Sequence, residues 1–158
     1  MPTPESRSKS EPQRARQQEL LTVLQKAEHG LEYLTSNDWV LLTDKARLVT
    51  LKKEEALLKR GQQTRQIFFL IEGMARIESQ PGTSIAHIGP GEICGEMAFL
   101  ERGRSSASVV AETEVRACAL DWPVMDELFE LYPHLGSRFY RSLAVSLSRR
   151  LRQVIGGS

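Results

Sequence analysis

The sequence has almost no excess of charge, only two cysteines and no long apolar run. Its 158 residues include 21 basic and 20 acidic side chains, so no overall field attracts nucleic acid or an anionic membrane. Its apolar runs are much shorter than a membrane span, and no secretory signal opens the chain. Cys94 and Cys118 make no disulfide framework, and we expect both to be small buried residues. These features predict a cytoplasmic protein that does not contact a membrane.

The sequence also lacks the usual catalytic patterns. Its three histidines, His29, His87 and His134, are scattered through different segments without the spacing of metal ligands. There is no Gly-x-Ser-x-Gly elbow, no Walker loop and no dinucleotide fingerprint. The serines near Arg104 have no evident histidine partner. We therefore expect no enzymatic activity, no metal and no resident cofactor.

The N-terminal part divides into a leader, residues 1–16, and a helical segment, residues 17–45. The leader holds three of the seven prolines and mixes charge with serine and glutamine, which predicts disorder. Its basic residues suit either nucleic acid or solvent, and we favour solvent. One apolar stripe then follows at 4-3-4-3 spacing and predicts a helix that Gly30 weakens or ends: Leu20, Leu24, Ala27, Leu31 and Leu34. A second helix is expected over Asp38–Lys45, with Thr35 or Ser36 as its N-cap.

The pattern changes over residues 46–120, where short runs of Val, Ile, Leu and Phe alternate with turns that contain glycine. Gln80-Pro81-Gly82-Thr83 is the clearest of these turns. Seven short strands at such regular spacing predict an antiparallel sandwich or barrel of the jelly-roll type. The expected strands are Leu48–Leu51, Ala56–Leu58, Gln66–Ile71, Met74–Glu78, Ser84–Ile88, Ala107–Ala111 and Val115–Leu120.

Residues 121–155 return to a helical pattern and predict two C-terminal helices. Asp121 is the expected N-cap of the first, which runs to about Tyr132 and ends at Pro133. The second covers about His134–Val154. It has an apolar stripe at four-residue intervals, Phe139, Leu143, Leu147 and Leu151, and basic residues near its end that suit the helix dipole. The predicted fold is thus α+β, mainly β: a jelly-roll barrel with N-terminal helices and two C-terminal helices.

One region, residues 91–110, has a more specific pattern. Its run Gly91-Glu92-Ile93-Cys94-Gly95-Glu96-Met97-Ala98-Phe99-Leu100 is followed by Arg104-Ser105-Ser106-Ala107-Ser108-Val109-Val110. Together these runs resemble the phosphate-binding cassette of cyclic nucleotide-binding domains, the family of catabolite activators and of protein kinase A regulatory subunits. The resemblance extends over about residues 31–155, through the glycine-punctuated strands around Gly61, Gly73 and Gly89.

The resemblance implies a ligand, cAMP or cGMP, and a role for each cassette residue. Glu96 takes the position of the carboxylate that binds the ribose 2′-hydroxyl. Gly95 lets the backbone bend closely around the ligand. Backbone amides at Met97, Ala98 and Ala107 complete the phosphate site, as a helix N-terminus does. These residue types suit the ligand because a carboxylate accepts from a hydroxyl, whereas a guanidinium fork matches phosphate oxygens.

The cassette departs from the family at one position. Counted from Gly95, the place of the phosphate-pairing arginine is occupied by Ser105, and Arg104 lies one residue earlier. If the loop Glu101-Arg102-Gly103 bulges by one residue, Arg104 takes the arginine's role, supported by Ser105 and Ser106. A hydroxyl residue directly after the arginine leans weakly toward cGMP in this family.

We therefore predict a regulatory domain that moves its C-terminal helices when it binds a cyclic nucleotide, acts on a protein effector and pairs with a second copy through its helices. The missing arginine motivates one alternative, a degenerate domain that serves as a protein-interaction module without nucleotide. Another alternative is the sensor half of a transcription regulator, in which a helix-turn-helix follows the last helix. Because the sequence ends at Ser158, we expect no nucleic-acid binding from these residues alone, unless they belong to a longer chain.

Overall fold

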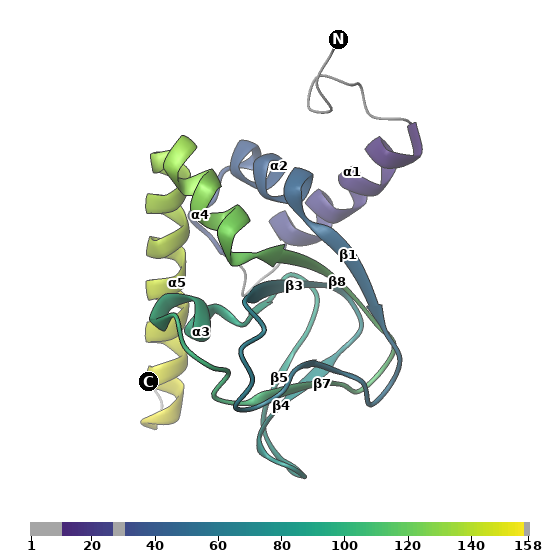
Figure 1. Cartoon of the computed structure of the whole chain (residues 1–158), viewed down its shortest axis with the longest axis vertical. Helices are drawn as coiled ribbons and strands as arrows, with labels where there is room; N and C mark the ends of the chain where they lie inside the picture. Colours follow the sequence, from purple (N-terminus) through teal and green to yellow (C-terminus); the bar gives the residue numbers. More distant parts are fainter. Residues whose placement is uncertain (1–10, 27–30, 157–158) are drawn as a thin grey trace.

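The computed structural model describes residues 11–26 and 31–156, which form two four-stranded antiparallel sheets with helices at both ends of the sequence (Figure 1). One sheet has the order β1-β8-β3-β6 and the other the order β2-β7-β4-β5. Every strand pair in both sheets is antiparallel. The strands are β1 (Arg47–Leu51), β2 (Ala56–Leu58), β3 (Gln66–Glu72), β4 (Ala75–Gln80), β5 (Thr83–Ile88), β6 (Ile93–Cys94), β7 (Ser108–Ala111) and β8 (Val115–Asp121).

This architecture confirms the predicted jelly-roll fold. All seven expected strands are present, with ends that differ by no more than two residues. The turn at Pro81-Gly82 joins β4 to β5, and Gly82 has the positive φ, 79°, that favours glycine. The eighth strand, β6, was not predicted from the sequence. It has only two residues, and such a short segment has no detectable alternation.

Two helices precede the sheets: α1 (Glu11–Lys26) and α2 (Ser36–Lys45). Residues 11–16, which the sequence places in the disordered leader, lie in α1, while residues 1–10 and Ala27 lie outside the described residues. The prediction took Pro12 as a sign of disorder, but proline is well tolerated in the first turn of a helix. The predicted cap of α2 is confirmed at Thr35: its hydroxyl accepts from the Asp38 amide at 3.1 Å, and the Asp38 carboxylate accepts from the Thr35 amide.

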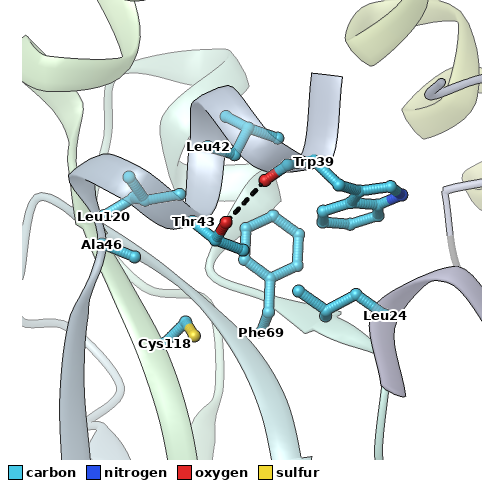
Figure 2. A pocket seen from close by; sticks show the side chains of 8 residues that line it. All are labelled: Leu24, Trp39, Leu42, Thr43, Ala46, Phe69, Cys118 and Leu120. Atoms are coloured by element: carbon cyan, nitrogen blue, oxygen red, sulfur yellow. Dashed lines mark hydrogen bonds between the residues drawn. The ribbon is translucent and has the colours of Figure 1, made fainter. Parts of the chain in front are cut away.

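The predicted N-terminal stripe is only partly helical. Leu20 and Leu24 are buried on α1, but the helix ends at Lys26, and Leu31 is buried from a turn rather than from a helix. Figure 2 shows how Leu24 of α1 and Trp39, Leu42 and Thr43 of α2 meet Phe69 of β3. Their side chains leave no room for a water-sized molecule, and none of these residues belongs to the cassette. This contact is therefore core that joins the helices to the first sheet.

The C-terminal helices are α4 (Trp122–Leu131) and α5 (Pro133–Val154), and they agree with the predicted boundaries within one residue. Asp121 is the N-cap residue of α4 by position, although its side chain makes no cap hydrogen bond. The carboxylate instead accepts from Gln66 at 2.8 Å and from Arg47 at 3.3 Å. Among the stripe residues of α5, Phe139 and Leu143 are buried, but Leu151 is 60% exposed, so the stripe leaves the core toward the end of the helix.

The first half of α5 is tied to the N-terminal helices. Arg138 donates two hydrogen bonds, of 2.6 and 2.8 Å, to the buried carboxylate of Asp38 on α2. The Arg138 guanidinium holds the pKa of Asp38 below its usual value. The amide of Tyr33 donates to the hydroxyl of the buried Ser142 at 3.1 Å. These contacts fix where α5 starts relative to α2.

Neither a membrane span nor a metal cluster occurs in the part of the chain that the structure describes. Its helices lack the combination of length and apolar composition that crossing a bilayer needs. Within the same residues, His, Cys, Asp and Glu do not gather in threes that could hold a metal ion. Cys94 and Cys118 are buried as predicted, and burial raises the pKa of both thiols.

Candidate functional site

The cassette begins with a turn that only glycine suits. Gly95 follows β6 with φ 86° and ψ 0°, in the left-handed region. A Cβ atom at this position would lie 2.8 Å from the carbonyl oxygen of Gln66 on β3. The chain therefore turns here at close range to the neighbouring strand, and the turn sets the direction of the short helix α3 (Glu96–Glu101).

Glu96, the predicted ribose residue, is a buried carboxylate at the start of α3. The residue is only 5% exposed, and burial raises the pKa of its carboxyl group above the usual value. Arg150 of α5 opposes that shift, because its Nη1 donates to Glu96 Oε1 at 3.0 Å. Desolvation outweighs the guanidinium here, since the carboxylate is almost fully removed from water while the Arg150 side chain is 38% exposed. The last third of α5 thus reaches the centre of the cassette.

The second half of the cassette alternates between exposed and buried side chains. The amide of Ser105 donates to the carbonyl oxygen of Gln62 at 3.0 Å, and the Gly61 amide donates to the Ser105 carbonyl at 2.8 Å. This strand-like pairing buries Ser105 and leaves Arg104 and Ser106 exposed. Arg104 Nη1 donates to the Gly61 carbonyl oxygen at 2.9 Å. The structure therefore places Ser105, rather than Arg104, on the inward side of this segment.

The other predicted site residues lie close to this segment or on α3. Met97 is exposed, and Ala98 is half-buried against the core. Ala107 is half-buried just before β7. The structure brings Glu96, Met97 and Ala98 together on one turn of α3, whereas the guanidinium of Arg104 is directed to the segment at Gly61.

Phe99 connects the cassette to both C-terminal helices. It lies on α3, is 1% exposed, and has ring-centroid distances of 6.1 Å to Trp122 on α4 and 6.2 Å to Phe139 on α5. Arg102, at the end of α3, lies 4.5 Å above the Phe99 ring and donates two hydrogen bonds to Asp126 on α4. A packed aromatic cluster and an ion pair therefore join the cassette to α4 and α5.

Arg150 is the residue of this region that sequence reasoning missed. The basic residues near the end of α5 were explained by the helix dipole, but Arg150 makes an ion pair with Glu96, 54 positions earlier. Nothing local in the sequence indicates a pair so far apart. Arg102 stands at the end of α3 just before a glycine, which marks it as a turn residue. Its partner Asp126 lies 24 positions later, and their contact depends on how α4 packs.

This fold and site define a β-roll domain that presents a buried carboxylate, on a short helix after a left-handed glycine, to the inner side of a C-terminal helix. The family model for the cyclic nucleotide-binding domain matches residues 48–132, which is more than half of the chain. The chain therefore belongs to the cyclic nucleotide-binding domain family, a family of regulatory domains, as the cassette predicted.

The chain is also similar to individual proteins. Cyclic GMP-binding protein C of Dictyostelium discoideum is 29% identical over 130 residues, which cover 75% of this chain and 5% of that protein. Glutaminase 2 of Bradyrhizobium diazoefficiens is 36% identical over 97 residues, 61% of this chain and 15% of that protein. A cyclic nucleotide-binding domain from Methylobacillus flagellatus has a similar structure, with a TM-score of 0.74 at 22% identity, over 88% of this chain and 80% of that one. The chain thus spans a small part of the two longer relatives.

Proposed function

We propose that the chain is a regulatory domain that binds cAMP or cGMP, with Glu96 as the residue that accepts from the ribose 2′-hydroxyl. The observation that carries the proposal is the buried carboxylate at the start of α3. A buried carboxylate lowers the stability of a protein, and such groups are concentrated at functional sites. The name of the Dictyostelium relative supports a cyclic nucleotide as the ligand. Arg104 as the phosphate residue stays a prediction, because its side chain is exposed and bonded to Gly61.

We further propose that nucleotide binding shifts the C-terminal end of α5. The first half of this helix is held by Arg138, which pairs with the buried Asp38, whereas its last turns are held by Arg149 on Glu32 at 3.0 Å and by Arg150 on Glu96. The Arg149–Glu32 pair is exposed on both sides, and such pairs contribute little to stability. A ligand that contacts Glu96 changes the balance between the two positions of this end, and that differential affinity is what a regulatory shift requires.

The first test is calorimetric titration of the full chain with cAMP and cGMP, beside the variants Glu96→Ala and Glu101→Ala. Glu101 is a matched control, since it is an exposed glutamate on the same helix. Loss of one hydrogen bond to a charged group is worth about 1.5–3 kcal/mol, so Glu96→Ala should weaken binding roughly ten- to a hundredfold. Glu101→Ala should bind like the wild type. Equal binding by both variants would refute the role of Glu96.

The same samples distinguish a sensor from a protein-interaction module. Saturating nucleotide should change amide hydrogen exchange in the last turns of α5 while leaving the segment around Arg138 unchanged. No binding up to millimolar nucleotide, by protein with an intact melting transition, would favour the module without ligand.

The remaining partner predictions depend on the surface of α5. Association of two copies stays a prediction, supported by the apolar residues exposed at the end of the helix, Leu151, Val154 and Ile155, and sedimentation velocity would check it. The protein effector and the cytoplasmic location likewise stay predictions.

A further inference from the structure

We propose that Arg150 of α5 is the residue that binds the ligand's phosphate, so that the nucleotide site is completed by the C-terminal helix. This inference rests on the proposed function and deepens it. It answers the question that Ser105 raises, namely which cation balances an anionic ligand in a cassette whose inward position carries a neutral hydroxyl.

The balance of charge requires such a cation. A cyclic nucleotide has one negative charge on its phosphate, and the carboxylate of Glu96 would lie beside it. Two negative charges close together in a buried site repel strongly unless cations are near both. Arg150 is already within hydrogen-bond distance of that carboxylate, because its Nη1 lies 3.0 Å from Glu96 Oε1. It is therefore in place to neutralise a second anion that enters at the same point.

The geometry of the guanidinium allows both contacts at once. Arginine has five N–H donors in a planar fork, and the hydrogen bond to Glu96 uses one of them. The Arg150 side chain is 38% exposed, so a ligand can reach the donors that face away from Glu96. A planar fork that holds a carboxylate on one edge and phosphate oxygens on another is a geometry in which arginine differs from lysine.

The other arginines near the cassette are directed elsewhere. Arg104 is exposed and donates to the Gly61 carbonyl, and Arg102 makes two hydrogen bonds with Asp126. Arg149, the neighbour of Arg150, turns to Glu32. Within the described residues, Arg150 is therefore the guanidinium that pairs with the cassette carboxylate.

The deciding experiment measures the affinity of the full chain for cAMP and for 2′-deoxy-cAMP, which keeps the phosphate but lacks the hydroxyl that Glu96 would bind. We expect Arg150→Ala to weaken both ligands by a similar factor, roughly ten- to a hundredfold. Glu96→Ala should weaken only cAMP. Arg104→Ala tests the other predicted phosphate residue: we expect a change of no more than about threefold for either ligand, and a loss as large as that of Arg150→Ala would overturn this inference. Arg150→Lys should recover part of the loss, since it restores the charge without the fork.

A rescue variant separates a ligand contact from a structural role. Ser105→Arg places a guanidinium at the inward position of the cassette segment, so the double variant Ser105→Arg with Arg150→Ala should regain most of the affinity. Circular dichroism melting would establish that each variant is folded before its affinity is measured.

Wild-type binding with an Arg150→Ala loss confined to cAMP would show that Arg150 only orients Glu96, and would overturn this inference alone. Unchanged binding by Arg150→Ala would also overturn this inference. Tighter binding would overturn it too, because Arg150 would then compete with the ligand for Glu96. If the wild type binds neither cAMP nor cGMP, the proposed function fails and this inference fails with it.

Discussion

Replacing Phe99 with alanine should lower the stability of the domain more than any substitution on the surface of the cassette. Removal of a buried phenylalanine typically lowers the free energy of unfolding by about 3–5 kcal/mol, which for a chain of this size is a fall in melting temperature on the order of 10 °C. Phe99 is fully buried between α3, α4 and α5, where it contacts Trp122, Phe129 and Phe139, so little can move in to fill the space.

Two further substitutions make this result specific. Leu100→Ala is the matched control, because Leu100 follows Phe99 on the same helix but is 39% exposed, and its loss should cost far less. Phe99→Leu keeps most of the apolar volume and should lie between the two. Thermal melts of the three variants test the order. A melting temperature of Phe99→Ala within a few degrees of that of Leu100→Ala would contradict the role given to the aromatic cluster.

Gly95→Ala is the second change for which we expect a large effect. Left-handed backbone at a residue other than glycine costs about 1–3 kcal/mol, and at Gly95 a Cβ would also come within 2.8 Å of the Gln66 carbonyl oxygen. Both the backbone strain and the close contact would act on the turn that sets the direction of α3, so the variant should lose stability and nucleotide affinity together.

Two glycines near the cassette serve as controls for the separate penalties. Gly61 has φ 83° but open space around its Cβ position, so Gly61→Ala measures the backbone strain alone. Gly103 has neither a positive φ nor a close neighbour, and Gly103→Ala should stay within about 0.5 kcal/mol of the wild type. If Gly95→Ala melts at the same temperature as Gly61→Ala, the approach to Gln66 has no cost.

Local patterns in the sequence were sufficient for most of the fold. Glycine-containing turns and runs of β-branched residues mark each strand with at least three residues, and the Thr35 cap is visible three positions before Asp38. The errors have local causes as well. The proline in the first turn of α1 made the start of that helix look like part of a disordered segment. The apolar stripe continues past the end of α1 because Leu31 is buried although it lies in a turn.

The candidate site was less predictable because its key contacts join distant segments. The resemblance to the family indicated Gly95 and Glu96, and it showed that Ser105 departs from the pattern. The direction of Arg104 depends on the pairing between Ser105 and Gln62, which spacing alone does not reveal. The pair of Glu96 with Arg150 depends on where α5 packs, and the anchor of that helix is a third contact, Asp38 with Arg138.

The buried carboxylate of Glu96 also makes the protein sensitive to acidity. Its pKa in the folded state is raised above 4.5, the ordinary value, so between that pH and the raised pKa the folded protein retains a proton that the unfolded chain has already released. The contribution of Glu96 to stability is therefore most favourable below the ordinary value and is lost as the pH rises through the raised one. At neutral pH Glu96→Gln should melt at a higher temperature than the wild type, because the amide carries no charge to bury, and this advantage should vanish in acid. A melting curve that favours Glu96→Gln equally at both acidities would assign its gain to something other than ionisation. A ligand that donates a hydrogen bond to Glu96 would offset the cost of burying this charge, a cost that the domain without ligand bears at neutral pH.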